Sequence, residues 1–407
     1  MKPASCVLIT IGDELLIGQT IDTNSAWLGR QLNPMGIAVK RRIAVGDVAD
    51  DIRSVLDEAR AMADLIIITG GLGPTSDDIT KPLLCDYFGT TLREDPKVLA
   101  HVTQFFARRN RPMLDSNRRQ ALVPATCEVL FNEMGTAPGM LFRDKGTMFI
   151  SLPGVPFEMQ HIMEQEGFNK IREAFHSTPL LHRSLLTSGE GESFLAERLK
   201  SFEAALPASL KLAYLPSLSQ VKLRLTSTAE AEQELMHSFS DLKTRVADIL
   251  VGEGDIEPEE IVADMLASSR QWLGLAESCT GGLLASRLTA IKGASQWFRG
   301  SLVTYTDFAK EHALGVSAET LRQHTAVSEE AVREMAQQAR IKLGSNFALS
   351  VSGYLEKNDH GNEVWIGLSS SSKTETHRFI ALYDRKKNAV LVCNTALNML
   401  RKFILSH

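Results

Sequence analysis

Three observations predict an α/β protein that opens with a doubly wound parallel sheet. Short apolar segments alternate with amphipathic ones from residue 6 to about 170, and again from residue 259. Leu65–Thr69 is apolar and β-branched, the pattern of a strand buried on both faces. A glycine cluster ends that strand at once. Alternation of this kind implies parallel strands with helices on both faces of the sheet.

The N-terminal elements follow in order. Apolar runs predict strands, and apolar periodicity, as at Ala26, Leu28 and Leu32, predicts helices. Pro82 falls near the first turn of a predicted helix, where proline is tolerated. The expected strands are Cys6–Ile11, Val39–Val45, Leu65–Thr69 and Met148–Leu152, and the expected helices are Asp22–Met35, Ala49–Ala63 and Asp78–Gly89.

The rest of the chain divides into a small α+β module and a second α/β part. The module has strands at His182–Thr187 and Gln220–Thr226 and helices at Glu192–Leu206 and Glu230–Val251. The acidic stretch Gly252–Pro258 is predicted to be a linker. After it we expect strands Trp272–Ala276, Leu302–Tyr305, Phe347–Val351 and Glu363–Ser369, with helices Ile261–Arg270, Gly282–Ile291, Ser328–Leu343 and Lys387–Leu405.

Composition narrows the class of protein. The 407 residues, 44% hydrophobic and 23% charged, fit two to four globular domains, and three fit best. A net charge of −5 argues against nonspecific nucleic-acid binding. No apolar run is long enough for a membrane span, and the N-terminus is typical of a first strand, not of a signal peptide. The five scattered cysteines indicate a reducing cytoplasm and no zinc site.

The densest motif is a glycine turn between a strand and a helix. Gly70, Gly71 and Gly73 would let the backbone approach a phosphate, while the helix N-terminus offers free N–H groups. Thr75 and Ser76 can donate hydrogen bonds to phosphate oxygens. Asp77 and Asp78 would repel a bare phosphate but could ligate a divalent metal such as Mg²⁺. A purely structural glycine turn remains an equal alternative.

A second carboxylate cluster follows the first strand. Asp13 and Glu14 could meet Asp77 and Asp78 around one metal, because parallel strands end at one edge of the sheet. Asp22 is better explained as the N-cap of the next helix. The turns Gly135–Gly139 and Pro153–Glu158 add two loops near the same edge.

The C-terminal part carries a candidate nucleophile. Ser278 lies between a strand and a helix, where the local field favours a developing oxyanion. Lys310 could act as its base if its pKa is lowered, and Tyr305 could relay a proton or orient the lysine. The alternative is that Ser278 or Thr280 caps a helix and Lys310 is solvated. Cys279 is a rival nucleophile without an evident histidine partner.

Four motifs in the first 165 residues (GDELLIGQTIDTN, GGLGPTSDDIT, GTAPG and LPGVPFEM) resemble the N-terminal half of the CinA family. That half is similar to the molybdenum-cofactor biosynthesis domain, which binds molybdopterin or its adenylate. The resemblance implies a metal-dependent pyrophosphatase acting on ADP-ribose. The glycine loop would hold the diphosphate, the carboxylates the metal, and a metal-bound water would attack phosphorus.

Residues 173–254 resemble the family's KH-like domain through Gly189–Ser193 and Tyr214–Ser217. No GXXG loop is evident, and Glu190 and Glu192 would repel phosphates, so we expect a structural or dimer-spacing role without nucleic acid.

Residues 258–405 resemble the family's C-terminal domain, a nicotinamide mononucleotide (NMN) amidohydrolase, through AESCTGG, YTDFAK and TAVSEE. The resemblance implies that Ser278 is the nucleophile and Lys310 the base, assisted by Tyr305, with no cofactor. Substrate contacts would come from Thr280, Gly281, Gly282 and Ser352.

One segment departs from the family pattern. Active relatives continue from the position of Ser352 with a Gly-Ile-Ala-Gly-Pro-type loop and then a Lys-Pro-Val-Gly segment. This chain reads SGYLEKNDHGNE and keeps only Gly353. Bulky and acidic side chains therefore replace a loop that should offer backbone N–H groups to a nucleotide, and the deamidase could be lost, slow or retargeted.

Together these features predict a cytoplasmic homodimer that contacts neither membrane nor nucleic acid. Residues 1–172 form a molybdopterin-binding-like domain, 173–254 a KH-like domain and 258–407 an amidohydrolase-like domain. The expected function is hydrolysis of ADP-ribose and NMN in pyridine-nucleotide salvage. The alternatives are a non-catalytic pterin- or nucleotide-binding protein and a molybdenum-cofactor enzyme.

Overall fold

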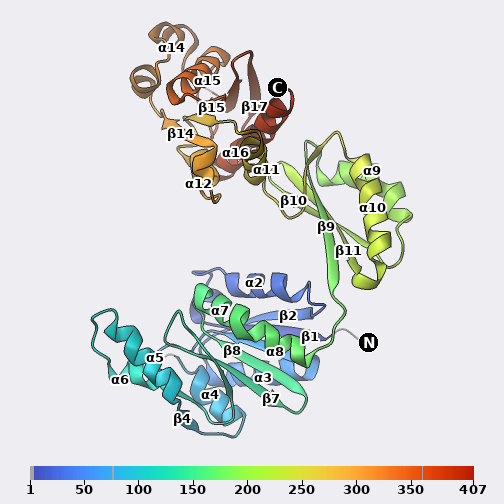
Figure 1. The fold of residues 1–407 in the computed structure, drawn as a ribbon, viewed down its shortest axis with the longest axis vertical. Coiled ribbons are helices and arrows are strands. Elements are labelled where there is room, and N and C mark those ends of the chain that lie inside the picture. Colours follow the sequence, from blue (N-terminus) through green and yellow to red (C-terminus); the bar gives the residue numbers. More distant parts are fainter. Residues whose placement is uncertain (1–3, 76–77, 360) are drawn as a thin grey trace. The chain divides into compact units, whose positions relative to one another are not determined.

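The computed structural model describes residues 4–75, 78–359 and 361–407, and it divides into two compact units (Figure 1). One unit contains residues up to Leu181 together with Thr228–Glu230, and the other contains the rest. In the described part of the chain, no helix is long and apolar enough to span a bilayer.

The first unit is built on a six-stranded sheet in the order β2-β1-β3-β8-β7-β6. The first four strands run parallel, and β7 and β6 complete one edge as an antiparallel extension. The strands are β1 (Ser5–Ile11), β2 (Ala38–Val45), β3 (Leu65–Thr69), β6 (Glu128–Leu130), β7 (Gly139–Asp144) and β8 (Thr147–Leu152).

Helices cover both faces of this sheet (Figure 1). Alternate residues of β1 enter opposite cores: Ile9 packs with α3 (Ala49–Met62) and α4 (Thr80–Tyr87), whereas Leu8 packs with α2 (Thr23–Leu32) and α7 (Pro156–Ile162). The doubly wound prediction is therefore correct. Asp22 accepts the N–H of Ser25 and caps α2, as expected.

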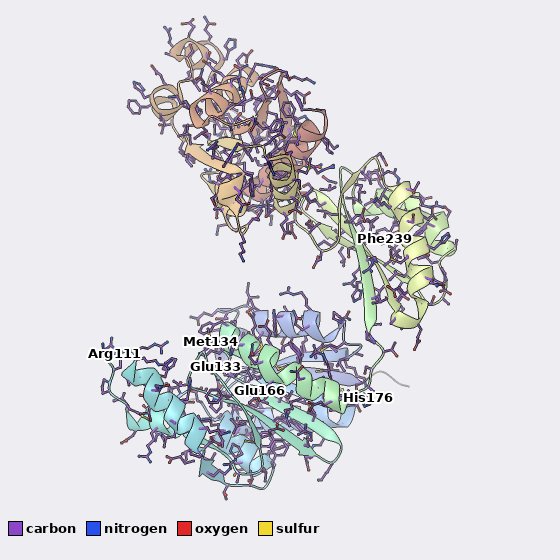
Figure 2. All side chains as sticks on the ribbon, in the orientation of Figure 1. Arg111, Glu133, Met134, Glu166, His176 and Phe239 are labelled. Atoms are coloured by element: carbon purple, nitrogen blue, oxygen red, sulfur yellow. The ribbon has the colours of Figure 1, made fainter. Side chains whose placement is uncertain are left out.

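Several elements of this unit were not predicted, among them β6, β7 and α7. The others are α1 (Asp13–Leu16), the paired strands β4 (Leu92–Glu94) and β5 (Leu122–Pro124), α5 (Pro96–Ala107), α6 (Asp115–Arg118), η1 (Arg119–Ala121), the π-helical segment η2 (Met163–Gly167) and α8 (Phe168–Ala174). Glu166 of η2 (Figure 2) accepts the N–H of Phe131 at 2.9 Å and so ties η2 to the end of β6.

The middle module of the second unit is a sheet in the order β10-β11-β9-β12 with two helices. The elements are β9 (Leu180–Ser188), α9 (Glu192–Ala204), β10 (Lys211–Ser217), β11 (Gln220–Thr228), α10 (Glu232–Arg245) and β12 (Leu250–Glu253). Phe239 of α10 (Figure 2) is buried. Two predictions are wrong where they meet. The end of the predicted helix Glu230–Val251 and the start of the predicted linker Gly252–Pro258 form strand β12, which pairs with β9.

The C-terminal part is a five-stranded sheet in the order β14-β13-β15-β16-β17. The first three strands are parallel and the last two antiparallel. The strands are β13 (Leu273–Glu277), β14 (Phe298–Val303), β15 (Phe347–Gly353), β16 (Glu363–Ser369) and β17 (Thr374–Ile380). The helices are α11 (Pro258–Ser269), α12 (Leu283–Thr289), α13 (Asp307–Ala309), α14 (Ala318–His324), α15 (Glu329–Leu343) and α16 (Arg385–Leu405), with a π-helical turn η5 (Lys310–Leu314). The predicted strand Leu302–Tyr305 ends at Val303, so Tyr305 lies in a loop.

Lys81 is a buried lysine in the N-terminal unit. Lys81, in the first turn of α4, directs its Nζ to the backbone oxygen of Gln120 at 2.9 Å and to its side-chain oxygen at 3.4 Å. Burial lowers the pKa of Lys81 to about 8, although the charge of Asp78 acts in the opposite direction. Folding therefore works against protonation of this amine.

We predict that Lys81→Met changes the pH dependence of stability. Between about pH 8 and 10.5 the unfolded chain holds a proton on Lys81 that the folded chain lacks, so stability rises with pH across this window. Across this window the free energy of unfolding should rise by at most ~3 kcal/mol because of Lys81. Lys81→Met should lack this rise. Urea unfolding at several pH values measures the slope, with the exposed Lys97→Met as control. Equal slopes in wild type and Lys81→Met would contradict the prediction.

Candidate active sites

The turn that carries Ser278 connects β13 to α12. Ser278 donates its backbone N–H to Val351 of the neighbouring strand β15 at 3.0 Å. Gly281 and Gly282 then take positive φ values of 59° and 100°, which non-glycine residues rarely adopt. These glycines let the chain reverse into α12, so their role in the structure is to shape the turn.

The buried carboxylate of Glu277 organises this turn. It accepts five hydrogen bonds: from the hydroxyls of Thr280 and Ser301 and from the backbone N–H groups of Gly282, Leu284 and Ala285. The three N–H groups belong to the start of α12, which has no other side-chain cap. Thr280, which is expected to contact substrate, donates its hydroxyl to Glu277 at 2.8 Å.

Ser278 and Lys310 form a buried pair, as the nucleophile–base hypothesis requires. Lys310 Nζ lies 3.0 Å from Ser278 Oγ and 3.1 Å from the backbone oxygen of Thr304. Ser278 is 7% exposed and Lys310 is 2% exposed, so the alternative of a solvated lysine is wrong. Burial lowers the pKa of Lys310, although the charge of Asp307 raises it. A neutral amine can donate to Thr304 and accept the Ser278 proton.

Tyr305 lies at the mouth of the same cavity, not against Lys310. Its side chain is 55% exposed, and its hydroxyl accepts a hydrogen bond from Arg385 Nη2 at 2.6 Å. Arg385 is the first residue of α16 and also lies 3.9 Å from Glu356. Tyr305 therefore joins Arg385 in lining the cavity, and the geometry gives no direct contact for a proton relay to Lys310.

The cavity above Ser278 has a volume of about 460 Å³. Ser352 lines it, but its hydroxyl donates to the backbone oxygen of Ala326 at 2.6 Å. The divergent loop after Ser352 also forms a wall, through residues 353–358. The cations Lys357 and Arg385 and the carboxylates Asp307 and Glu356 give this cavity a mixed charge.

Cys279 is a poor rival to Ser278. Burial raises the pKa of its thiol to about 12, so the nucleophilic thiolate is scarce at neutral pH. All five cysteines are buried and unpaired.

The second cavity lies at the carboxyl edge of the N-terminal parallel sheet and has a volume of about 400 Å³. Loops after β1, β2, β3 and β8 line it, and they contribute Glu14, Asp47, Gly70–Pro74 and Pro153–Val155. Gly70 has φ 108°, and a Cβ there would lie 2.2 Å from the backbone oxygen of Ile11. Gly71 has φ 64°, so glycine is required at both positions to pass the loop beside β1.

Two of the predicted N-terminal carboxylates, Asp13 and Asp78, have separate partners. Asp78 accepts the N–H of Gly73 at 2.7 Å and the N–H and hydroxyl of Thr75, and so holds the glycine loop closed. Asp13 accepts the N–H of Asp47 at 3.2 Å and is not part of the cavity wall, whereas Glu14 and Asp78 are. Ser76 and Asp77 lie outside the described residues.

Within residues 4–75, 78–359 and 361–407, no three His, Cys, Asp or Glu side chains come close enough to hold a metal ion. The described carboxylates therefore do not fit a metal site by themselves. A further carboxylate, Glu158, lines the cavity and accepts a hydrogen bond from Asn132 at 2.7 Å. Burial raises the pKa of Glu158, and the bond from Asn132 partly offsets this.

Sequence reasoning missed three residues of these sites. Glu277 stood inside a recognised motif, but nothing in the motif indicates that its carboxylate is buried. Arg385 lies 80 residues after Tyr305, a separation that offers no periodic signal. Glu158 was noted only as part of a turn, and its position depends on Asn132, which also binds Met134, Gly135 and Ala137.

Comparison with known proteins covers the chain in three segments. Family models match for a probable molybdopterin binding domain over residues 7–173, for the damage-inducible protein CinA KH domain over 182–253, and for the CinA C-terminal domain over 255–404.

Relatives match along the full length. A CinA-like protein of Cytophaga hutchinsonii is 42% identical over 405 residues, 97% of each chain. A CinA-like protein of Flavobacterium psychrophilum is 40% identical over 411 residues, 98% of each chain. The solved structure of the protein CinA with unknown function from Thermoplasma acidophilum is 33% identical and covers 42% of this chain and 99% of that one, with a TM-score of 0.38.

We predict that Glu277→Gln destabilises the C-terminal part by about 2–4 kcal/mol. The amide would turn an NH₂ group toward some of the five donors that the carboxylate accepts. Urea unfolding of the full chain measures the loss, with the exposed Glu311→Gln as the matched control. A Glu277→Gln protein as stable as wild type would contradict this account of the turn.

Proposed function

The chain belongs to the CinA family, and we propose that its C-terminal domain hydrolyses the carboxamide of NMN to ammonia and nicotinic acid mononucleotide. The observation that carries the proposal is the 3.0 Å approach of two buried groups, Lys310 Nζ and Ser278 Oγ, at the base of a cavity. A serine paired with a lysine of lowered pKa is a known form of activated nucleophile.

In this mechanism Lys310 takes the hydroxyl proton while Ser278 Oγ attacks the carboxamide carbon. Collapse of the tetrahedral intermediate breaks the C–N bond, and Lys310 returns the proton to the departing ammonia. A water molecule, activated by Lys310 in the same way, then hydrolyses the acyl ester and restores Ser278. Thr304 supports the cycle because its backbone oxygen keeps Lys310 Nζ beside Ser278.

The cavity wall supports a mononucleotide as substrate. Arg385 is partly exposed at the mouth, beside Tyr305, and a guanidinium binds phosphate in a bidentate manner. The loop 353–358 supplies Lys357 but also Glu356, which competes for Arg385. A phosphate group must displace this weak 3.9 Å contact, so we expect slower or weaker use of NMN than a glycine-rich loop would allow.

We predict that Ser278→Ala and Lys310→Met each lower ammonia release from NMN by roughly a thousandfold or more. Each removes one half of the proton-transfer pair. Ser286→Ala and Lys342→Met, both at exposed positions, should keep wild-type rates. In wild type the rate should rise with pH through the lowered pKa of Lys310, because only the neutral amine accepts a proton. Retained turnover in Lys310→Met would exclude the lysine as base.

For the N-terminal domain we infer a nucleotide-diphosphate site, with ADP-ribose as the expected ligand. Support comes from the glycine loop that Asp78 fixes in shape along the wall of the 400 Å³ cavity, and from the position of that cavity at the carboxyl edge of a parallel sheet. The same loop could hold a molybdopterin, which is the competing proposal. Metal-dependent hydrolysis would need a carboxylate beyond those described, for which Asp77 is the candidate.

We predict different defects for Asp78→Asn and Asp77→Asn. Asp78→Asn loosens the glycine loop and should weaken ADP-ribose binding about tenfold even in EDTA, because the bonds lost are to a charged acceptor. Asp77→Asn should leave binding in EDTA unchanged and slow turnover at limiting Mg²⁺. Calorimetry and AMP release measure the two effects. Unchanged turnover in Asp77→Asn at limiting metal would contradict the metal-ligand assignment, and displacement of ADP-ribose by a pterin would favour the alternative.

A further inference from the structure

A third polar cavity lies at the opposite end of the C-terminal sheet from Ser278. Strand β16 runs antiparallel to β15, with Gly353 opposite Val364 and Ala348 opposite Ser369. The turn that joins β16 to β17 is therefore at the amino end of β15, whereas Ser278 and Ser352 are at the carboxyl end. The cavity has a volume of about 420 Å³ and lies between the turn Ser369–Thr374 and helix α15.

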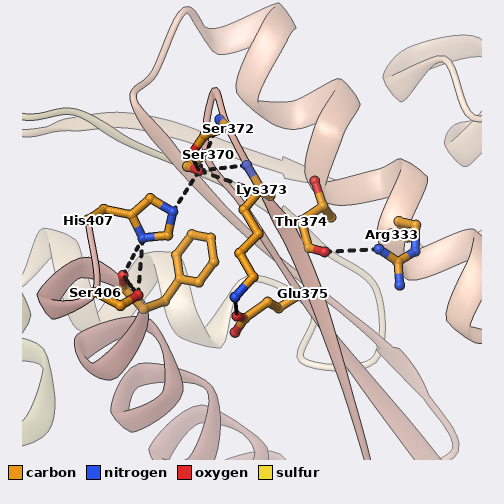
Figure 3. A network of polar contacts seen from close by, with 9 residues as sticks. Arg333, Ser370, Ser372, Lys373, Thr374, Glu375, Ser406 and His407 are labelled. Atoms are coloured by element: carbon orange, nitrogen blue, oxygen red, sulfur yellow. Dashed lines mark hydrogen bonds and ion pairs between the residues drawn. The ribbon is translucent and has the colours of Figure 1, made fainter.

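The turn is held in a defined shape (Figure 3). Ser370 Oγ accepts the N–H groups of Ser372 and Lys373 at 3.3 and 3.1 Å, and His407 Nε2 lies 3.0 Å from the same oxygen. On the side of α15, Arg333 donates to the backbone oxygen of Thr374 at 2.9 Å. The turn is thus tied to α15 and to His407, two residues past the end of α16, and Ser371 and Ser372 are exposed.

The wall of this cavity is cationic. It contains Arg333, Arg340 and Lys373, and no carboxylate is among its lining residues. Two of the cations are compensated from outside the wall, since Arg333 pairs with Glu329 and Lys373 with Glu375.

Arg340 has no such compensation. Its Nε is buried without a hydrogen-bond partner, and among the described residues no ion pair reaches its guanidinium. A buried donor of this kind normally has a partner, because leaving it unsatisfied costs about 1–3 kcal/mol.

We propose that this cavity binds a phosphate-type oxyanion, with the Arg340 guanidinium as its main ligand. A guanidinium offers a planar fork of donors that matches two oxygens of a phosphate. The amides of Gln337 and Gln338 and the exposed hydroxyl of Ser371 can donate to the remaining oxygens. The oxyanion is either free inorganic phosphate or pyrophosphate, or the phosphate ester of a mononucleotide. The site is separate from both cavities of the proposed function.

Hydrogen exchange of the full-length protein tests the proposal, because one peptide reports on this turn separately from the other two cavities. Inorganic pyrophosphate should slow amide exchange in the peptide that covers Ser369–Thr374. Arg340→Gln should raise the pyrophosphate concentration for half-maximal protection about tenfold or more. Arg322→Gln, which removes an exposed arginine of α14 paired with Glu319, should leave that concentration unchanged. A parallel titration with AMP separates the sources: protection by pyrophosphate alone indicates a free oxyanion, and protection by AMP indicates a phosphate ester.

A second variant keeps the test valid if Arg340→Gln does not fold. Ser371→Asp adds a carboxylate at an exposed turn position without touching α15, and it should weaken protection similarly. No protection of the turn in wild type at millimolar pyrophosphate and AMP would overturn the proposal. So would equal protection in wild type, Arg340→Gln and Ser371→Asp.

Discussion

The C-terminal site depends on one buried carboxylate. Glu277 is the last residue of β13, and the groups that bind it come from the following turn, from α12 and from β14. A charge removed from water is stable only when donors surround it, and here five do so. Because these donors lie on three elements, the angle between strand and helix is fixed, and Ser278, the next residue, is held facing Lys310. Ser278, the proposed nucleophile, is therefore positioned by a neighbouring carboxylate that has no bond-making role in the proposed mechanism.

In the N-terminal cavity, too, a carboxylate fixes the shape of a turn by accepting hydrogen bonds. Asp78 closes the glycine loop by accepting hydrogen bonds from Gly73 and Thr75, and Asn132 arranges the turn beside Glu158. In both sites a carboxylate accepts hydrogen bonds from backbone N–H groups of the adjoining turn and so fixes the shape of that turn. The two cavities differ in the ionisable groups that line them. The C-terminal cavity has a lysine of lowered pKa at its base, and the N-terminal cavity has carboxylates along its wall.

Much of the fold could be predicted from the pattern of apolar residues and glycines in the sequence. Buried strands such as β3 and the glycine turns after them have strong local signatures, and Ser278 and Lys310 met because each follows the carboxyl end of a neighbouring parallel strand. What failed depended on pairing at a distance. Strand β12 was divided between a predicted helix and a predicted linker, because only its pairing with β9 defines it as a strand, and β17 was not predicted. Thr280 and Tyr305 were assigned to substrate binding and catalysis from a family resemblance, and these assignments stay predictions. Their hydrogen-bond partners Glu277 and Arg385 were not foreseen. Membership of the CinA family, inferred from motifs, was confirmed along the full length.

The hydrogen bond between Tyr305 and Arg385 has a consequence for biosynthesis. Arg385 opens α16, the helix that follows every other element of its domain, so the ribosome adds this wall of the Ser278 cavity last. Until α16 packs against the sheet, both the core beneath β13 and β15 and the mouth of the cavity are incomplete. The N-terminal cavity draws on residues between Ile11 and Glu158 and is finished far earlier in translation. The two cavities of one polypeptide thus mature at different times, and the nascent chain passes through a stage with only the first complete.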